Sequence, residues 1–499
     1  MICIPIAAST GVEVLSDLEK AENVADLIEL RLDLLPRDTW LLLLNQLKKP
    51  LIVTLRPERQ GGRFKGEEAE RIGLLEGVLS FKPAFIDVEW DTPKELIESL
   101  RRKKNGETRL ILSYHDFQGT PDDLEGIWKR IDSLNPDLIK IVTYATRIED
   151  NAKILKFAQN HRNKIIAFCM GPVGLPSRIL TLRFGGLVTY ASLDKGHESA
   201  PGQIPVQELT DVYRVKEIGQ ETRIFGLVGN PVTHSLSPLI HNSAFKALGV
   251  NAVYIPFQVP DLNDLLPTLR FLGVHGFSVT IPYKQGIIPF LDEVNEMADT
   301  MGVVNTVCRR DEQWVGTNTD GDGAWDALQT ADVALMNKRW TLLGAGGVAR
   351  AVAYCVGTRG RPRSLIFLSR SPKKLWEMVD DTRQLFSFPI DGALLSEKDL
   401  RKRLDLTDIL VNCTPVGMFP RAEETPIPPH LLSPSHLVFD TIYNPLETRL
   451  LKETKERGCH TVSGLEMFLS QGAAQFELWT GKSAPLPLMR VKSLERFET

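Results

Sequence analysis

Eight short apolar runs, separated by segments with helical spacing, fill roughly the first 220 residues and limit the fold more than any other feature. The runs are residues 2–7, 27–33, 51–55, 84–89, 110–114, 138–143, 165–170 and 186–191. Segments between them, such as 92–103 and 149–160, repeat apolar residues at helical intervals. Strands that alternate with helices pair in parallel, and about eight such units favour a closed (β/α)8 TIM barrel. The alternative, an open doubly wound sheet, usually has fewer strands per domain.

A second pattern begins near residue 222. Residues 223–229 form an apolar run that leads to a helix predicted from Leu239. Residues 339–350 then place a strand, a glycine turn and a helix start in the order that a dinucleotide-binding fold requires. Segment 211–220 is predicted to be the last helix of the barrel, so little linker is left between the two patterns.

Bulk properties exclude several classes of protein. A chain of 499 residues suggests two to four domains, and its net charge of −4 gives no reason to expect nucleic acid or an anionic membrane as a partner. The chain has no apolar run of the ~20 residues needed to span a bilayer. Its start lacks the features of a signal or transit peptide. Six cysteines without CxxC spacing indicate neither a metal site nor a disulfide framework, which favours a reducing cytoplasm.

Polar and ionisable side chains stand at nearly every predicted strand end of the first half. Active sites of such barrels lie at the carboxyl ends of the strands. A ring of these residues at one mouth therefore indicates a site, although for Glu89 capping of the following helix stays open as an alternative. The residues are Glu29, Arg31, Arg56, Glu89, His115, Lys140 and Met170, then Ser199 and Gln203 after the last strand.

Lys140 is unusual because it lies in the apolar run Asp-Leu-Ile-Lys-Ile-Val. A lysine on an edge strand can lay its stem along apolar surface without any function. At the mouth of an apolar barrel, however, desolvation and nearby cations would lower its pKa, and the neutral amine could form a Schiff base with a carbonyl compound. With His115 to move protons and Arg178 to bind a carboxylate, the residue types favour aldol cleavage or loss of water on a small keto acid.

The ordered motifs of residues 1–219 resemble those of type I 3-dehydroquinate dehydratases. They are Glu29-Leu-Arg31, Thr54-Leu-Arg56, Ser113-Tyr-His115-Asp116-Phe117, Asp137-Leu-Ile-Lys140, Met170-Gly with Ser177-Arg178, and Ser199-Ala-Pro-Gly-Gln203. The resemblance implies that Lys140 forms an imine with the substrate ketone and that His115 is the general acid/base. It also implies substrate contacts from Arg178, Ser199 and Gln203, and a lining that includes Glu29, Arg31, Arg56 and Met170.

One position departs from this family's pattern. The family usually has a glutamate just before Gly61-Gly62, where it helps to orient the histidine, whereas this chain has Gln60. A glutamine can hydrogen-bond the imidazole but cannot stabilise its charged form. The departure puts the rate and the pH optimum in question more than the reaction.

The glycine turn of the second half predicts a nucleotide site. Gly344, Ala345, Gly346, Gly347, Val348 and Ala349 follow a strand and open a helix, where the backbone can approach a pyrophosphate. An NAD-preferring domain would carry an acid at the end of the next strand. This chain has Ser369, Arg370 and Ser371 there, followed by Lys373 and Lys374, so NADP is the predicted cofactor.

Further motifs in residues 222–499 resemble shikimate dehydrogenases. They are Gly229-Asn-Pro with Ser235-Leu-Ser237, Val279-Thr280-Ile-Pro-Tyr-Lys284, Val304-Asn305-Thr306, Gly316-Thr-Asn-Thr-Asp320-Gly321, Asn412-Cys-Thr414-Pro, residues 440–443, and Gly464-Leu-Glu-Met467 with Gln471. The resemblance implies that Ser235 and Ser237 hold a carboxylate, that Thr280, Asn305 and Gln471 hold ring hydroxyls, and that Tyr443 joins the substrate site. It implies proton handling by Lys284 and Asp320, and cofactor contacts from Thr414 and Gly464. Ser278 replaces an asparagine usual in bacterial members.

Together the two resemblances imply a bifunctional enzyme of aromatic amino-acid precursor synthesis. The expected parts are a barrel at 1–219, a substrate-binding domain at 222–328 completed by helices in 463–499, and a Rossmann domain at 329–462. Small-molecule substrates are expected rather than nucleic acid or membrane, and assembly into a homo-oligomer stays open. Two alternatives remain: a quinate- or shikimate-sensing regulator derived from the same enzymes, and a second half that prefers quinate and NAD.

Overall fold

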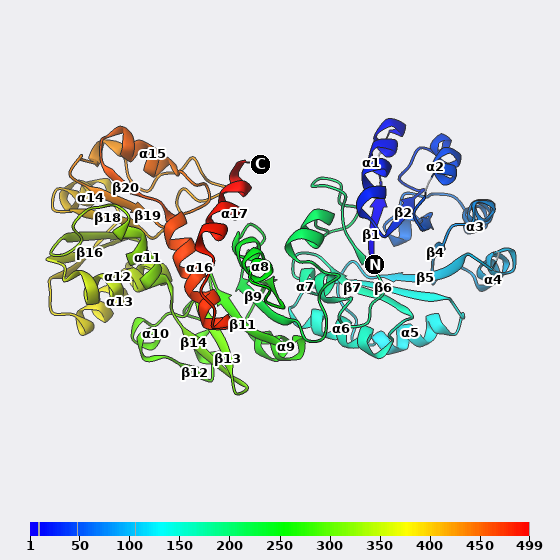
Figure 1. Ribbon diagram of the computed structural model, residues 1–499, viewed down its shortest axis with the longest axis horizontal. Coiled ribbons are helices and arrows are strands. Elements are labelled where there is room, and N and C mark those ends of the chain that lie inside the picture. The colour runs from blue at the N-terminus through cyan, green and yellow to red at the C-terminus, as the bar shows by residue number, and fades with distance from the viewer. Residues whose placement is uncertain (8–9, 47, 105, 499) are drawn as a thin grey trace. The chain divides into compact units, whose positions relative to one another are not determined.

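The computed structural model describes residues 1–7, 10–46, 48–104 and 106–498 (Figure 1). The chain forms two compact units, residues 1–238 with 251–274 and residues 239–250 with 275–499.

Eight parallel strands form the barrel of the first unit, as the sequence predicts. They are β1 (Ile2–Ile6), β2 (Leu27–Arg31), β3 (Leu51–Thr54), β4 (Phe85–Glu89), β5 (Arg109–His115), β6 (Leu138–Tyr144), β7 (Ile165–Met170) and β8 (Thr189–Tyr190). Their order is β7-β6-β5-β4-β3-β2-β1-β8. Near the β7–β8 seam the Leu187 amide donates to the Ile165 carbonyl at 2.9 Å, so the barrel is nearly closed. Its interior packs one apolar residue from most strands, including Cys3, Ile52, Ile111 and Ile166.

Helices surround this barrel on the outside (Figure 1). They are α1 (Gly11–Val24), α2 (Trp40–Gln46), α3 (Glu68–Val78), α4 (Lys94–Lys103), α5 (Leu124–Asp132), α6 (Glu149–Asn160) and α7 (Leu175–Leu180). The prediction of a last helix at 211–220 was wrong. A single π-helical turn occupies Glu208–Val212, and Arg214 adopts a left-handed φ of 50°, which ends helical geometry. The first unit also contains the parallel pair β9 (Arg223–Gly229) and β10 (Ala252–Gln258), followed by α9 (Leu265–Leu272).

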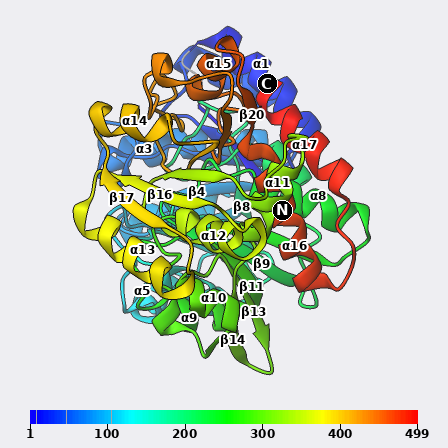
Figure 2. The same cartoon turned by 90° about the vertical axis from the view of Figure 1, so that its left-hand side faces the viewer.

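The second unit contains an open parallel sheet of the Rossmann type. Its strands are β15 (Arg339–Leu343), β16 (Ser364–Ser369), β17 (Ile390–Leu394), β18 (Ile409–Asn412), β19 (Leu437–Asp440) and β20 (His460–Val462), in the order β17-β16-β15-β18-β19-β20. Figure 2 shows α12 (Gly347–Cys355) and α13 (Pro372–Leu385) in front of this sheet. Leu400 of α14 (Glu397–Leu404) and Leu450 of α15 (Arg449–Glu456) join a separate core with Leu368 and Val438, so the sheet is buried on both faces.

The remaining elements of the second unit are another set of strands and further α-helices. Strands β11 (Val274–Val279), β13 (Thr306–Arg310) and β14 (Gln313–Thr317) pair antiparallel, and β12 (Glu293–Val294) pairs parallel with β14. Helices α8 (Ser237–Ala247), α10 (Glu296–Met301), α11 (Asp320–Gln329), α16 (Gly464–Thr480) and α17 (Leu486–Glu498) complete the fold. Helix α8 starts two residues before the predicted Leu239. Gly323 of α11 packs closely against α16, since a Cβ there would lie 3.0 Å from Gln471.

Candidate active sites

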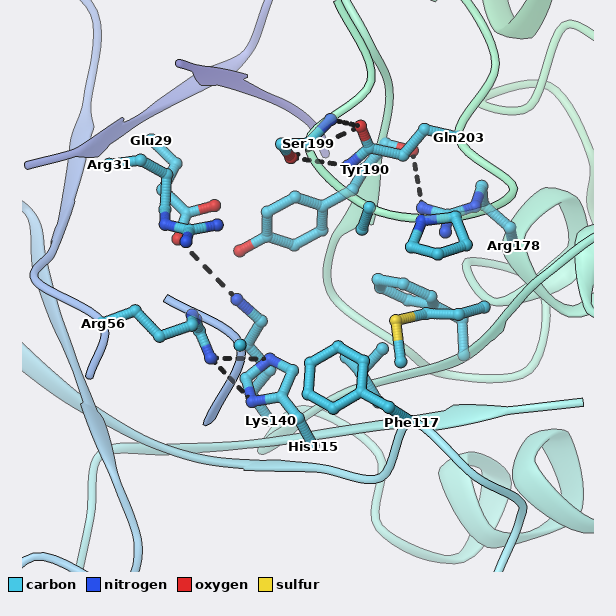
Figure 3. Close-up of a pocket in the computed structure, with 16 residues that line it drawn as sticks. Glu29, Arg31, Arg56, His115, Phe117, Lys140, Arg178, Tyr190, Ser199 and Gln203 are labelled. Atoms are coloured by element: carbon cyan, nitrogen blue, oxygen red, sulfur yellow. Dashed lines mark hydrogen bonds and ion pairs between the residues drawn. The ribbon is translucent and has the colours of Figure 1, made fainter. Parts of the chain in front are cut away.

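All the barrel residues singled out from the sequence except Glu89 surround one cavity at the carboxyl ends of the strands (Figure 3). The cavity has a volume of about 210 Å³. Its lining includes the predicted residues Glu29, Arg31, Arg56, His115, Lys140, Met170, Arg178, Ser199 and Gln203, and also Gly61, Phe117, Val142, Phe168 and Tyr190. Phe117 belongs to the His115 motif, whereas Val142, Phe168 and Tyr190 had no motif to mark them in the sequence.

Lys140 does not stand at a strand end, contrary to the prediction. It is the third residue of β6, which continues to Tyr144 because β6 stays paired with β7 as far as Met170. The side chain is only 4% exposed and lies with its Nζ 4.6 Å from the centre of the Tyr190 ring. The amine therefore projects from the cavity floor, with apolar and aromatic groups around its stem.

Two carboxylates accompany the Lys140 amine. Nζ donates to Asp87 Oδ2 at 2.9 Å, and Glu29 Oε1 lies 3.8 Å away. Burial alone would raise the pKa of Asp87, but Lys140 and Arg56 hold it below its ordinary value. The sequence reading missed Asp87. It could have been found from the two-residue period of β4, because Asp87 and Glu89 lie on the same face of that strand.

His115 ends β5 and lies against Arg56. Arg56 Nη1 is 2.7 Å from the imidazole Nδ1 and 3.0 Å from Nε2, and donates to whichever nitrogen is unprotonated. Burial and then the charges of Arg56, Lys140 and Arg31 hold the pKa of His115 well below its usual range. The imidazole is therefore neutral near pH 7 and able to accept a proton.

Arg178 of α7 is buried on the opposite wall with unused donors. Its Nη1 donates to the Tyr190 carbonyl at 3.0 Å, while Nε and Nη2 have no acceptor among the described residues. Burial lowers the pKa of Arg178 to about 10. Beside it, Ser199 and Gln203 close a small loop in which the Ser199 amide donates to Gln203 Oε1 at 2.8 Å. This wall has the donors that a substrate carboxylate requires.

Gln60 and Glu89 differ from their sequence-based interpretation. The Gln60 amide donates to Asp91 Oδ2 at 3.3 Å, and no contact with His115 is found in the described part of the chain. Glu89 does not cap α4, whose first residue follows Pro93. Its carboxylate is fully buried between Arg56 and Arg71 instead, at 3.6 Å and 2.7 Å.

In the second unit, Lys284 and Asp320 form an ion pair. Lys284 Nζ donates to Asp320 Oδ2 at 2.5 Å, and Asn305 Nδ2 donates to Asp320 Oδ1 at 2.9 Å. Asp320 is the first residue of α11, and Asn318 accepts its amide at 2.9 Å. Lys284, Asp320 and Asn305 thus lie together. The main-chain carbonyl of Gln471 accepts from the Thr319 hydroxyl at 3.3 Å, while the Gln471 side-chain amide donates to the Phe468 carbonyl at 2.9 Å.

The other predicted substrate residues of this half lie in separate settings. In the first unit, the Ser235 hydroxyl donates to Ser237 Oγ at 3.1 Å at the start of α8. In the second unit, Thr280 is half-buried directly after β11, and the Tyr443 ring stacks on Phe468 at 4.3 Å between centroids. Ser278, the departure from the bacterial pattern, donates to Gln475 Oε1 at 2.8 Å.

The glycine turn after β15 has the backbone shape that a dinucleotide needs. Gly344 has φ +105°, and a Cβ on Gly346 would meet no atom within 4 Å, which leaves open space over the start of α12. Gly347 is close to the catalytic loop, since a Cβ there would lie 3.1 Å from Lys284 Cβ. Ala345, Val348 and Ala349 complete the turn and the first helical residues. The turn fits a pyrophosphate at a helix N-terminus next to Lys284.

The remaining cofactor candidates lie at neighbouring strand ends of the same sheet. Ser369 ends β16, and its hydroxyl accepts the Ser371 amide at 3.3 Å, while Arg370 between them is exposed. After β18, the Thr414 hydroxyl donates to Asn412 Oδ1 at 2.7 Å. Gly464 begins α16 beside the Ile442 carbonyl, where a Cβ would lie at 2.4 Å. The exposed Arg370 fits a 2′-phosphate.

The described residues offer no candidate for a metal site or a membrane-spanning helix. They contain no group of three or more His, Cys, Asp or Glu side chains arranged to hold a metal ion. None of their helices has the length and apolar character needed to cross a membrane.

Comparisons with known proteins identify relatives of both halves. Family models match as type I 3-dehydroquinase over residues 2–220, as the shikimate dehydrogenase substrate binding domain over 227–307, and as the shikimate 5'-dehydrogenase C-terminal domain over 464–490. A chloroplastic bifunctional 3-dehydroquinate dehydratase/shikimate dehydrogenase of Arabidopsis thaliana is 36% identical over 98% of this chain and 83% of its own length.

The second half has relatives of its own. The shikimate dehydrogenase (NADP(+)) of Moorella thermoacetica is 43% identical over 55% of this chain and 93% of its own length. A crystal structure of a shikimate dehydrogenase in complex with NADP+ matches with a TM-score of 0.52 at 36% identity, covering 56% of this chain and 97% of that one. The bifunctional relative of Arabidopsis thaliana spans both halves of this chain at 36% identity. The chain therefore belongs to the family of bifunctional 3-dehydroquinate dehydratase/shikimate dehydrogenases.

Proposed function

We propose that this enzyme dehydrates 3-dehydroquinate to 3-dehydroshikimate through a Schiff base on Lys140 and then reduces the product to shikimate with NADPH. The observation that carries the first step is the Lys140 amine on the cavity floor, 2.9 Å from Asp87, in the same cavity as a neutral His115. The second step is supported by the Lys284–Asp320 pair beside the glycine turn.

In the barrel, Lys140 first gives up a proton and attacks the ketone carbon. Loss of water from this adduct yields an iminium, which draws electrons from the neighbouring carbon. His115 takes a proton from that carbon and returns it to the departing hydroxyl, which leaves as water. Hydrolysis of the imine then consumes one water and frees Lys140, so the balance is loss of one water from the substrate.

Substrate orientation in the barrel comes from the opposite wall. The unused Nε and Nη2 of Arg178 would bind the substrate carboxylate, with Ser199 and Gln203 beside it. Glu29, Arg31 and Arg56 lie on the side of the cavity away from Arg178 (Figure 3), where they would face the ring hydroxyls. This arrangement would place the ketone toward Lys140, since the two groups bind at opposite ends of a rigid ring.

In the dehydrogenase half, NADPH bound on the 344–349 turn would supply the hydride. Arg370, with Ser369 and Ser371, would hold its 2′-phosphate, and Thr414 and Gly464 would line the nicotinamide side. Lys284 would donate the proton that the reduced oxygen requires, with Asp320 and Asn305 fixing its position. Ser235 and Ser237 would hold the carboxylate, and Thr280, Tyr443 and Gln471 the ring.

Domain bounds and compartment belong to the same proposal. The barrel would comprise 1–219, the substrate-binding domain 222–328 with helices of 463–499, and the Rossmann domain 329–462. All six cysteines are free thiols, which supports a reducing compartment such as the cytoplasm. The relative in Arabidopsis is described as chloroplastic.

Incubation with dehydroquinate and NADPH tests both steps together, with shikimate as the expected product. Borohydride added with dehydroquinate should trap an adduct whose mass maps to the peptide that contains Lys140. An adduct on another lysine, or none, would contradict the barrel mechanism, and Lys140→Met is the matched control.

The same assay separates the alternatives. A regulator would bind the substrates without converting them. Such a protein is expected to have lost its catalytic residues, but this chain retains Lys140, His115, Lys284 and Asp320. Initial rates with shikimate and quinate, each with NADP and NAD, would reveal a quinate dehydrogenase. A clear preference for NAD would refute the assignment of Arg370.

A further inference from the structure

A chain of buried charges lies behind the contact between His115 and Arg56. Arg56 Nη1 lies 3.6 Å from Glu89 Oε1, and Glu89 Oε2 lies 2.7 Å from Arg71 Nη1. Glu89 and Arg71 are both 0% exposed. Neither is near enough to the cavity to line it. Buried charges of this kind need a specific reason, because desolvating them is costly.

Hydrogen bonds hold the Arg71 guanidinium in place. Nη1 donates to the Leu55 carbonyl at 2.9 Å, and Nη2 donates to the Thr92 hydroxyl at 2.8 Å and to Glu68 Oε2 at 2.9 Å. Leu55 directly precedes Arg56. Arg71 therefore holds both the main chain next to Arg56 and the carboxylate that faces the Arg56 guanidinium.

Residue 60 does not hold the imidazole in this chain. The Gln60 amide points to Asp91, which also takes both Nε and Nη2 of Arg59 at 3.1 Å. Among the described residues, Arg56 is the one side chain that hydrogen-bonds His115. The orientation of the imidazole thus depends on the orientation of Arg56.

We infer that Glu89 and Arg71 are positioning residues of the dehydratase, which hold Arg56 against His115. They would thereby orient the imidazole, as a glutamate at position 60 does in the family pattern. The inference rests on the proposed function of the barrel. Neither residue touches the reacting atoms. Their effect runs through Arg56, as outer hydrogen-bonding partners orient the groups that do the chemistry.

The acid limb of the pH–rate profile reports this arrangement. His115 faces the cations Arg56, Lys140 and Arg31, and the carboxylates around Arg56 are Asp87, Glu89, Glu29 and Asp33. After burial, Arg56 is the largest influence that lowers the pKa of His115. If Arg56 loses its anchor and moves away, this pKa rises, and the acid limb of kcat/KM moves up with it.

Glu89→Gln is the decisive variant, because loss of charge and loss of positioning predict opposite shifts of the acid limb. Loss of the carboxylate charge alone would lower the pKa of His115 and move the acid limb down. Loss of positioning moves it up. We expect an upward shift of about 0.5 units or more with a fall in dehydratase kcat of about 10–100-fold. The limb position does not depend on the fraction of folded enzyme.

Arg71→Met and Arg71→Lys form a matched pair. Methionine removes the charge and the bond to Leu55, and should give the same upward shift and loss of kcat. Lysine keeps the charge toward Glu89 and should recover kcat to within about threefold of wild type. Arg101→Met is the control, because it removes another barrel arginine that donates to a main-chain carbonyl, that of Leu134, and should leave both quantities unchanged.

Dehydrogenase activity of the same preparations measures how much intact chain is present. An acid limb that stays in place or moves down in Glu89→Gln would overturn the inference, as would a kcat within about twofold of wild type. Borohydride trapping on Lys140 in the wild-type enzyme separates this result from failure of the proposed function. A wild-type chain without turnover or adduct refutes the function, whereas normal wild type with unaffected variants refutes the positioning.

Discussion

The two halves of this chain each contain a lysine paired with a buried aspartate, but the pairs have different surroundings. In the barrel, Asp87 binds Lys140 at 2.9 Å and also Arg56 at 3.3 Å, and Glu29 lies 3.8 Å from the same lysine. In the second unit, Asp320 binds Lys284 at 2.5 Å, and its other oxygen accepts from the neutral amide of Asn305. One pair belongs to a network of charges, and the other stands alone with neutral donors.

This difference matches the two kinds of chemistry. A lysine nucleophile must give up its proton, and Asp87, whose pKa Lys140 and Arg56 hold below its ordinary value despite burial, fixes the position of the Lys140 amine by an ionic hydrogen bond. A lysine that donates a proton to a reduced oxygen needs its ammonium aimed at one point, which a single carboxylate with fixed hydrogen bonds provides. Under the proposed function, the same two residue types would serve covalent catalysis in one half and proton delivery in the other.

The largest effect should follow from removing the nucleophile. Lys140→Met is expected to lower dehydratase kcat on the order of 10⁴-fold, because Lys140 has the only amine among the described residues that line the cavity. Dehydrogenase activity, measured with shikimate and NADP in the same sample, should stay within about twofold of wild type. Comparable losses in both assays would show that the halves do not act as independent sites.

Breaking the second pair should cost less. Asp320→Asn keeps the shape but removes the charge that fixes Lys284, and should lower dehydrogenase kcat about 10²–10³-fold with little effect on the dehydratase. Asp322→Asn, which removes an exposed carboxylate from the same helix, is the control. If Asp320→Asn leaves kcat near wild type, proton delivery does not depend on the pair, and the contrast with Lys140 would lose its meaning.

The sequence was sufficient for the strands and for most of the barrel site. Eight predicted runs match β1–β8, and the helix expected at 149–160 has those limits, because apolar period and strand–helix alternation are local properties. The segment at 211–220 failed because the left-handed backbone at Arg214 depends on surrounding packing rather than on apolar period.

Distances within the site were the part that the sequence could not supply. Lys140 was placed at a strand end, although β6 runs on to Tyr144, since strand limits depend on the pairing partner. Three residues, Asp87, Tyr190 and Arg71, were missed from the sequence. None belongs to a motif, and each contributes to the site only through contacts with side chains that the fold brings near it. Gln60 was considered for its possible bond to His115, and its contact with Asp91 emerges only in three dimensions.

The comparison extends to the two arginines proposed to bind anions, the buried Arg178 and the exposed Arg370. Replacing Arg178 should weaken substrate binding but stabilise the ligand-free barrel. Arg178→Met removes the carboxylate anchor and should raise the dehydratase KM about 10²-fold, as expected for a buried charge-assisted contact. It also removes two buried donors without acceptors, so the ligand-free barrel should gain about 1 kcal/mol after loss of the 4.6 Å contact with Phe168.

Thermal unfolding without ligand and steady-state kinetics measure these two effects on one preparation. A fall in both barrel stability and affinity would show that Arg178 is mainly structural and that its free donors have an acceptor in solution. Thr181→Val serves as a buried control on the neighbouring turn, because its hydroxyl binds only the Ala167 carbonyl and does not face the cavity.

The smallest effect is expected at the exposed arginine. Arg370→Ser should raise the KM for NADP about tenfold and leave the KM for NAD unchanged, because a solvated charge pair contributes about 1 kcal/mol, less than a buried one. Lys398→Ser, which removes an exposed cation from α14, should change neither. An equal change with both nucleotides would mean that Arg370 contacts the shared adenosine part rather than the 2′-phosphate. A change in the KM for NADP as large as the KM change of Arg178→Met would mean that Arg370 becomes buried when the nucleotide binds. The two anion sites would then differ in burial only in the ligand-free enzyme.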